Sequence, residues 1–346
     1  MKKILFKIFV ILFALILFLL FFCYQGVYTE KDPQGEDVVF VVEKGDGVFD
    51  IAGNLEERGI IKKEQFFVLY TVFSGKEKDL KAGSYLLSSS MNVAEIVGEM
   101  FLGSENKVTI IEGWNLRDIA GYLKQEGFGD AEEFYSLAGE PPFFEDGKLR
   151  NKKEGKMEWE IAFLEKIPDI ETAEGFLFPD TYYISPGTPV ENVLEAMLLN
   201  FERKVVRGMK KEITGSDMSL FEIITLASLL EREVRDFEEK RIIAGIIKER
   251  LEKGMRLQID ATITYLTGRR SVNIPIKETR INSPYNTYVY TGFPKGPICS
   301  PSIESIEAAL SPKESEYLYY LSKRNGETVF SRTHSEHIEA KKKYLR

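Results

Sequence analysis

The sequence is short of the residue types that form disulfides and metal centres. Its 346 residues include two cysteines, Cys23 and Cys299, and two histidines, His334 and His337. The cysteines lie far apart in the chain, so we expect no disulfide between them and a fold held together by its apolar core. A zinc enzyme with histidine ligands would be poorly supplied. We therefore expect no metal site, and a local structural role for the two histidines.

Two common chemical motifs are also missing. No glycine-rich phosphate loop follows a predicted strand, and the G-x-S-x-G motif is absent. Pyridoxal phosphate chemistry would need a Schiff-base lysine in a phosphate-binding pocket, and no lysine of this chain has such a setting. We therefore expect no cofactor.

Positive charge is in deficit. The chain has 46 Lys and Arg residues against 54 Asp and Glu residues, a net charge of -8. The segment 1–29 contains three lysines and no acidic residue, so the remainder is more acidic than the whole chain. A surface of that sign argues against nucleic acid as a partner and against tight binding of the domain to anionic lipid. It is compatible with a neutral polymer such as a glycan.

One long apolar run is present, at the N-terminus. Residues 8–24 carry no charge, and with residues 4–6 the apolar stretch reaches about twenty residues, enough for a helix to cross a bilayer. Lysines precede the run and acidic residues follow it, so the positive-inside rule leaves the N-terminus in the cytoplasm. We expect an anchor at 1–27 and a linker at 28–37, with the rest of the chain outside the cell membrane.

Two other interpretations of this run compete with the retained anchor. A cleaved signal peptide would have small residues at a cleavage site after the run, whereas residues 21–25 include Phe21, Phe22 and Tyr24. A lipoprotein acceptor at Cys23 would follow a small residue, and Phe22 is bulky. Both observations favour a single-pass anchor that stays in the protein.

The chain repeats itself after the linker. Residues 50–59 align with residues 118–127, and the match continues at the same offset. Each copy follows a β-branched segment that predicts a strand, at 38–42 and at 108–111. Each unit is therefore expected to be a strand followed by two helices. Two unrelated strand–turn–helix units could become similar because they share a composition, but the number of identical residues in the two segments favours duplication.

A capping box at 219–222 predicts a helix start. The eight residues that follow are uncharged, so the helix should be buried on most faces. Glu231 is the first charge after this run, and partial burial would raise its pKa, as a general acid at neutral pH needs. The alternative is a solvated helix end on which Glu231 pairs with Arg235, and spacing alone favours that alternative. Glu233 points roughly to the other side.

Aromatic and polar residues gather in three further blocks. Residues 173–184 place carboxyl and hydroxyl groups among aromatic rings, which suits a sugar ring but is equally typical of a strand and turn with core aromatics. Blocks 257–265 and 283–288 are predicted to lie on turns. Such segments are typical of the rim of a binding site and equally typical of plain turns. The candidates in these blocks are Glu174, Asp180, Tyr182, Gln258, Asp260, Asn286 and Tyr288.

These blocks together resemble a known family. Their order along the chain is similar to that of the MltG (YceG-like) family of endolytic murein transglycosylases. The blocks are residues 174–182, 227–233, 257–260, 283–288, 296–298 and 330–337. Ile259 and Ala261 depart from the family's Leu-Gln-Ser-Asp-Pro-Thr pattern, which puts in doubt a hydroxyl contact at position 259.

The resemblance implies an α+β fold and a reaction. It implies a transmembrane helix, a small LysM-like βαα module at 38–104, and a catalytic domain at 105–346 in which 105–140 resembles a second copy of the module. The family cleaves the bond between N-acetylmuramic acid and N-acetylglucosamine without water and leaves 1,6-anhydro ends, which would end strand elongation. The implied partners are peptidoglycan strands and membrane-bound synthases.

The resemblance also implies site residues. The family's catalytic glutamate is the first Glu of its Ala-Ser-x-x-Glu-x-Glu block, which is Glu231 here. A non-catalytic peptidoglycan-binding scaffold, in which Glu231 is structural, is the alternative. The residues expected to bind substrate are Glu174, Asp180, Tyr182, Gln258, Asp260, Tyr285 and Asn286.

Overall fold

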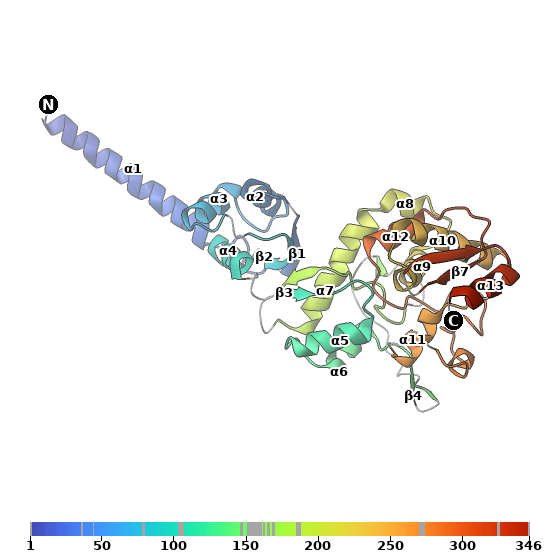
Figure 1. Ribbon diagram of the computed structural model, residues 1–346. Coiled ribbons are helices and arrows are strands. Elements are labelled where there is room, and N and C mark those ends of the chain that lie inside the picture. The colour runs from blue at the N-terminus through green and yellow to red at the C-terminus, as the bar shows by residue number, and fades with distance from the viewer. Residues whose placement is uncertain are drawn as a thin grey trace. The chain divides into compact units, whose positions relative to one another are not determined.

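The computed structural model divides into two compact units. It describes residues 2–35, 37–43, 45–77, 80–102, 107–145, 148–150, 161, 163–164, 167, 170–184, 188–269, 274–323 and 326–344. The charged run 151–156 lies outside these residues. The first unit contains residues 1–109 and 181–188, and the second contains residues 110–180 and 189–346 (Figure 1).

The first unit is built on a four-stranded mixed sheet. The strand order is β1-β2-β6-β3, with β1 and β2 antiparallel, β2 and β6 parallel, and β3 and β6 antiparallel. Phe40 and Val42, two positions apart on β1, enter the core because side chains alternate across a strand. The elements are α1 (Lys2–Tyr28), β1 (Asp37–Val42), α2 (Val48–Glu57), α3 (Glu64–Phe73), β2 (Gly83–Ser88), α4 (Val93–Leu102), β3 (Lys107–Thr109) and β6 (Thr181–Tyr183).

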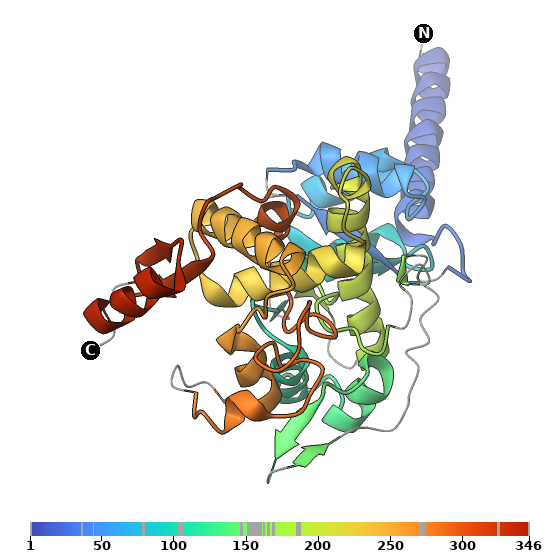
Figure 2. The ribbon, with the colours of Figure 1, turned by 90° about the vertical axis from the view of Figure 1, so that its right-hand side faces the viewer.

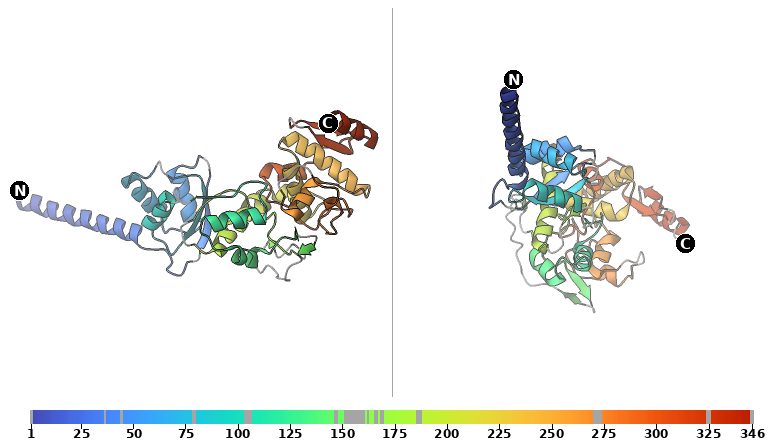
Figure 3. Two further views of the ribbon diagram at one scale, coloured as in Figure 1. Left: turned by 60° about the horizontal axis from the view of Figure 1, so that its bottom comes forward. Right: turned by 90° about the vertical axis from the view of Figure 1, so that its left-hand side faces the viewer.

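Helix α1 is apolar over most of its length. Residues 6–28 have a mean hydropathy of 3.0, and within the described residues this is the one helix long and apolar enough to cross a membrane, a property that an anchor shares with a signal sequence. Figure 3 shows its N-terminal part extending away from the rest of the first unit. Its C-terminal end packs on α3 and α4. There Val27 is 5% exposed and belongs to the core of the unit.

The segment predicted to be a linker is bound to the sheet. The backbone N–H groups of Lys31 and Asp32 donate to the carbonyl of Ser89 over 3.1 and 2.9 Å. The hydroxyl of Ser88 donates to the carbonyl of Gly35 over 2.8 Å. These contacts hold the chain between α1 and β1 against the end of β2.

Corresponding residues of the two repeats cap their helices in the same way. The Asp50 carboxylate accepts a hydrogen bond from the N–H of Gly47 before α2, over 2.9 Å. Asp118 accepts from the N–H of Asn115 before α5 (Leu116–Gln125), over 3.2 Å. A carboxylate in the first turn satisfies a backbone donor that the helix leaves free. α6 (Ala131–Ala138) follows α5 as α3 follows α2.

The second unit is mostly helical and is centred on α9 (Leu220–Glu233). The predicted capping box is confirmed, because Ser219 and Glu222 exchange hydrogen bonds of 3.3 and 2.8 Å. Residues 223–230 are all buried, as predicted. α9 packs against α10 (Phe237–Glu252), α11 (Asp260–Thr267) and α12 (Ile303–Leu310). The helices α7 (Val190–Phe201), η2 (Glu202–Arg207), α8 (Lys210–Thr214) and η3 (Glu278–Arg280) complete this part.

Two small hairpins complete the second unit. β4 (Phe143–Glu145) pairs with β5 (Lys148–Arg150), and β7 (Tyr319–Ser322) pairs with β8 (Thr328–Ser331). Helix α13 (His334–Tyr344) packs on β7 and β8, and Figure 2 shows this C-terminal group in red. The chain as described is thus a mixed α+β protein, as predicted.

Candidate active site

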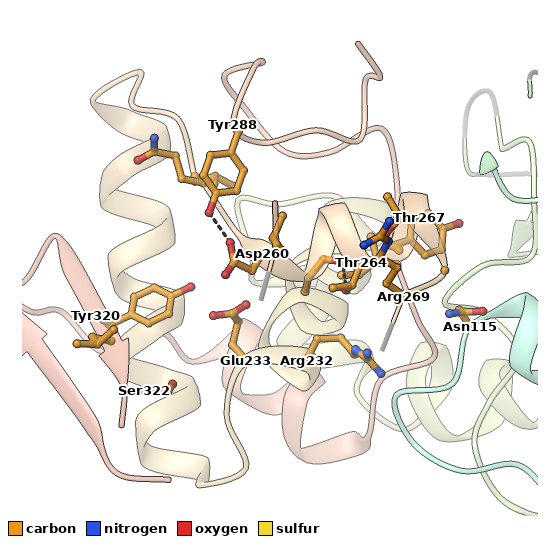
Figure 4. Close-up of a pocket in the computed structure, with 18 of the residues that line it drawn as sticks. Asn115, Arg232, Glu233, Asp260, Thr264, Thr267, Arg269, Tyr288, Tyr320 and Ser322 are labelled. Atoms are coloured by element: carbon orange, nitrogen blue, oxygen red, sulfur yellow. Dashed lines mark hydrogen bonds between the residues drawn. The ribbon is translucent and has the colours of Figure 1, made fainter. Parts of the chain in front are cut away.

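A large open pocket lies within the second unit. Its volume is about 1570 Å³, more than the 300–1,000 Å³ of most small-ligand sites. Its walls come from the start of α5, the end of α9, the loop before α11, α11 itself, β7 and α13. Figure 4 shows Glu233, Asp260, Tyr288 and Tyr320, which line this space, turned toward one another. A pocket of this size and openness suits a segment of a polymer.

Glu233, the last residue of α9, points into the pocket (Figure 4). Burial among the pocket walls, helped by the nearby negative charge of Asp260, raises its pKa to about 7, against a hydrogen bond from the Tyr320 hydroxyl and the positive charge of Arg232. A carboxyl group with this pKa holds a proton for much of the time at neutral pH. It can therefore donate that proton to a bound substrate.

Asp260 and Gln258 line the same pocket. Asp260 begins α11, and its carboxylate accepts a hydrogen bond from the Tyr288 hydroxyl (Figure 4). Gln258 has a φ of 51°, the one positive φ of a non-glycine residue in the described chain. This left-handed conformation costs roughly 1 kcal/mol, and the Gln258 N–H is held by the carbonyl of Thr287 over 3.0 Å. The loop before α11 is thereby fixed against the loop that carries Tyr288.

Glu231, the predicted catalytic residue, does not line this pocket. Its carboxylate accepts hydrogen bonds from the N–H and hydroxyl of Ser302 over 3.0 and 2.5 Å and from the hydroxyl of Ser305 over 2.6 Å. Lys240 lies 3.6 Å from the same oxygen and takes the place that Arg235 was expected to fill. The contacts join the end of α9 to the start of α12.

The predicted pKa of Glu231 is wrong in direction. Burial acts to raise the pKa, but the hydrogen bonds from Ser302 and Ser305 and the charge of Lys240 outweigh burial and hold the pKa below its ordinary value. A carboxyl group in this state keeps its charge at neutral pH and has no proton to give. The prediction was based on the apolar helix before Glu231. The hydrogen-bond donors Ser302 and Ser305, which α12 places beside the Glu231 carboxylate, could not be identified from the sequence.

Glu174 is fully buried behind the pocket wall. Its carboxyl group accepts hydrogen bonds from the N–H of Leu116 over 3.2 Å and from the Tyr265 hydroxyl over 3.0 Å. Burial raises its pKa to about 7, although Arg117 acts in the other direction. Tyr265 lines the pocket and Glu174 does not. Glu174 therefore positions the start of α5 and the ring of Tyr265, and its contact with substrate stays a prediction.

Asp180 and Tyr182 also lie away from the pocket. Asp180 accepts a hydrogen bond from Asn200 over 2.9 Å and pairs with Lys204 at 3.0 Å. Tyr182 is fully buried and sits in β6, in the sheet of the first unit. The block around these residues is therefore a strand and turn with core aromatics, which was the alternative interpretation.

Tyr285 and Asn286 shape the loop that carries Tyr288. Asn286 is fully buried; its amide donates to the carbonyl of Ile281 over 2.7 Å and accepts from the N–H of Tyr288 over 2.9 Å. The ring of Tyr285 is buried and lies 5.3 Å from that of Tyr265. Of the predicted substrate-binding residues, Gln258 and Asp260 line the pocket.

Three residues that line the pocket were not predicted from the sequence: Glu233, Arg232 and Tyr320. Glu233 stands in the same sequence block as Glu231, two positions later, and that block was the available signal. His334 and His337 lie on α13, and both line the pocket. In the described part of the chain, no group of three or more His, Cys, Asp or Glu residues is arranged to hold a metal ion.

The fold and the site define a mixed α+β protein whose larger unit carries a carboxyl group of raised pKa in an open pocket. Beyond this class, a model of the YceG-like family matches residues 40–343, and the chain belongs to the YceG-like family. This confirms the resemblance on which the sequence analysis relied.

Three known proteins are similar over most of the chain. A Bacillus subtilis (strain 168) protein named endolytic murein transglycosylase is 32% identical over 92% of this chain and 87% of its own length. A protein of the same name from Streptococcus pneumoniae serotype 2 (strain D39) is 30% identical over 97% of this chain and 66% of its own length. The crystal structure of a yceG-like protein from Listeria monocytogenes has a TM-score of 0.57 and 27% identity, and the match covers 89% of this chain and 100% of that one.

Proposed function

We propose that this protein is an endolytic lytic transglycosylase that cleaves peptidoglycan strands between N-acetylmuramic acid and N-acetylglucosamine and leaves 1,6-anhydro ends. Membership of the YceG-like family and the names of the relatives support this activity. The observation that carries it is a carboxyl group, Glu233, with a pKa of about 7 in a pocket of polymer size.

One carboxyl group suffices for this reaction. Glu233 gives its proton to the glycosidic oxygen as the bond to C1 of the muramic acid breaks. The C6 hydroxyl of the same sugar then attacks C1, and its proton passes to the Glu233 carboxylate, which restores the acid. Glycosidases that use water need a second carboxyl group to activate it or to form a covalent intermediate. Here the nucleophile is the C6 hydroxyl of the substrate itself, so no second carboxyl group is needed.

We assign the acid role to Glu233 and a structural role to Glu231. The two residues lie two positions apart on α9, and a helix turns by about 200° over two residues. Glu233 therefore meets the pocket, and Glu231 meets Ser302 and Ser305 at the start of α12. The proton needed at neutral pH is on the group whose pKa is raised.

Matched substitutions test the activity and the assignment together. Glu233→Gln keeps the shape of the side chain and removes the transferable proton, so the cleavage rate of purified glycan strands should fall by about 10²–10⁴-fold. Glu231→Gln should retain cleavage when assayed well below its unfolding temperature. Products are separated by mass, because anhydro ends lack the water that hydrolysis adds.

Two results would contradict the proposal. Strands left intact by the wild-type protein would favour the non-catalytic scaffold. Loss of cleavage in folded Glu231→Gln, with cleavage kept in Glu233→Gln, would return the acid role to Glu231.

We also propose that α1 is a retained anchor with its N-terminus in the cytoplasm, and that the second unit acts outside the cell membrane. Cleavage directly after the apolar run would remove the ring of Phe22 from that of Phe66, 5.5 Å away, and would cut α1 just before Val27, which belongs to the core of the first unit. A cleaved signal peptide would not be expected to be continuous with a helix that completes the core of the mature protein. These contacts support retention.

The first unit would contain the LysM-like module that the resemblance implies. The elements of this unit follow one another as β1-α2-α3-β2, and β1 and β2 pair antiparallel. This arrangement supports the proposal of a LysM-like module. The roles in ending strand elongation and in contacting membrane-bound synthases follow from the family resemblance alone, and a two-hybrid or crosslinking assay with the synthases tests the contact.

A further inference from the structure

The charge of the pocket is opposite to that of the chain. Six Lys and Arg side chains line the pocket against three Asp and Glu side chains, whereas the whole chain has a net charge of -8. The acids, Asp118, Glu233 and Asp260, belong to the start of α5, the end of α9 and the start of α11. The wall formed by β7 and α13 adds cations and no acidic side chain to the lining. The sugar rings of a glycan are neutral and offer this wall no charge to bind.

Arg250 is the fixed cation behind this wall. It is 7% exposed, its Nε and Nη1 donate to the carbonyls of Leu318 and Leu257 over 2.7 Å each, and its guanidinium lies 5.0 Å from the centre of the Tyr319 ring. No ion pair joins it to a carboxylate within the described residues. A buried cation without an anionic partner is costly, and an anionic group of a ligand in the pocket would offset that cost.

α13 adds further positive charge and an unsatisfied polar atom. Lys341 lines the pocket one turn after His337. The His337 ring stacks on Tyr319 at 5.3 Å, and its Nδ1 is buried without a hydrogen-bond partner among the described residues. Burial and the positive charges of Lys341 and Arg250 lower the pKa of His337 to about 4. The ring is thus neutral at pH 7 and lies in a positive environment.

We propose that the wall of Arg250, Tyr319, His337 and Lys341 binds carboxylate groups of the peptide branches that peptidoglycan carries on its muramic acid residues. This inference deepens the proposed function and rests on it for the identity of the polymer. Cations fixed beside tyrosine rings suit a short acidic peptide next to a sugar. The protein would then select strands that still bear peptides over strands from which the peptides have been removed.

Binding to the full-length Glu233→Gln protein tests the wall separately from cleavage. The probes are glycan strands with peptides, the same strands stripped of peptides by an amidase and then chemically amidated at the lactyl carboxylates that this exposes, and strands whose peptide carboxylates have been chemically amidated. Strands with free carboxylates should bind about tenfold more tightly than either control, the effect of one charge-assisted hydrogen bond. Equal binding of all three would overturn the inference.

A matched pair of lysines locates the effect. Lys341→Gln should reduce the ratio of affinities for peptide-bearing and stripped strands several-fold. Lys342→Gln, its exposed neighbour on α13 that does not line the pocket, should keep the ratio. An equal change of the affinity ratio in the two variants would contradict the inference. So would a Lys341→Gln variant that loses the same affinity for peptide-bearing strands as for stripped strands. If wild-type protein shows the binding preference but cleaves nothing, the proposed activity fails and the carboxylate site stands.

Discussion

At the scale of single residues, the site depends on two glutamates of one helix that have opposite electrostatic environments. Glu231 receives three hydrogen bonds and a nearby lysine, and its pKa is lowered. Glu233 receives one hydrogen bond in a site that burial dominates, and its pKa is raised to about 7. The same side chain is thus a structural anion at one position and a proton donor at the other, because of its neighbours alone.

The pKa of Glu233 predicts how activity depends on pH. The acid must be protonated when the glycosidic bond breaks, so kcat/KM should fall as the pH rises above about 7. Tyr320→Phe removes a hydrogen bond that favours the charged carboxylate, so this alkaline limb should move upward by up to about one pH unit. Tyr319→Phe, in the same strand, should leave the limb in place. A downward shift in Tyr320→Phe would contradict this account.

At the scale of elements, two interfaces position the working parts: α9 against α12 in the second unit, and α1 against α3 in the first. Glu231 joins the first pair. Glu231→Gln replaces a charged acceptor of three hydrogen bonds with a neutral amide, so we expect the free energy of unfolding to fall by about 2 kcal/mol. Chemical denaturation of the full-length protein in detergent measures the change. Equal stability would show that the contacts at α12 contribute little.

The second interface depends on a glycine. A Cβ at Gly26 would lie 2.3 Å from a ring atom of Phe66, whereas a Cβ at Gly98 on α4 would meet no atom within 4 Å. Gly26→Ala should therefore displace the Phe66 ring and destabilise the first unit by about 1–3 kcal/mol. Gly98→Ala should be neutral or stabilising, since alanine favours the helix. Limited proteolysis in detergent compares the two, and equal resistance would contradict the packing of α1 on α3.

At the scale of the whole molecule, the sequence predicts those features that depend on neighbouring residues. The capping box at Ser219, the buried stretch of α9 and the long apolar helix were all predicted from local patterns. The return of residues 181–188 to the first unit was not, because β6 pairs with β2 across about a hundred residues, and a three-residue strand leaves no periodic signal. The pocket face of α9 was also hidden, because a helix buried all round has no periodicity that marks one face.

Two of the buried carboxyl groups also make the stability of the protein depend on pH. Glu174 has a folded pKa of about 7 against an ordinary value of 4.5, so the folded state holds its proton more tightly than the unfolded state does. Its contribution is complete below pH 4.5 and is lost as the pH rises through about 7. The loss is about 3 kcal/mol for a group this buried. Glu233, whose pKa is also raised to about 7, acts in the same direction.

Glu174→Gln should flatten this dependence. The amide cannot ionise, so the fall in unfolding free energy between pH 5 and 8 should shrink by about 3 kcal/mol, although the variant is less stable at low pH because the amide cannot reproduce every hydrogen bond. Glu171→Gln, three positions earlier and exposed, should keep the wild-type slope. Denaturant unfolding across this pH range provides the measurement. A slope in Glu174→Gln as steep as in the wild type would mean that the buried group behind Tyr265 is charged in the folded protein.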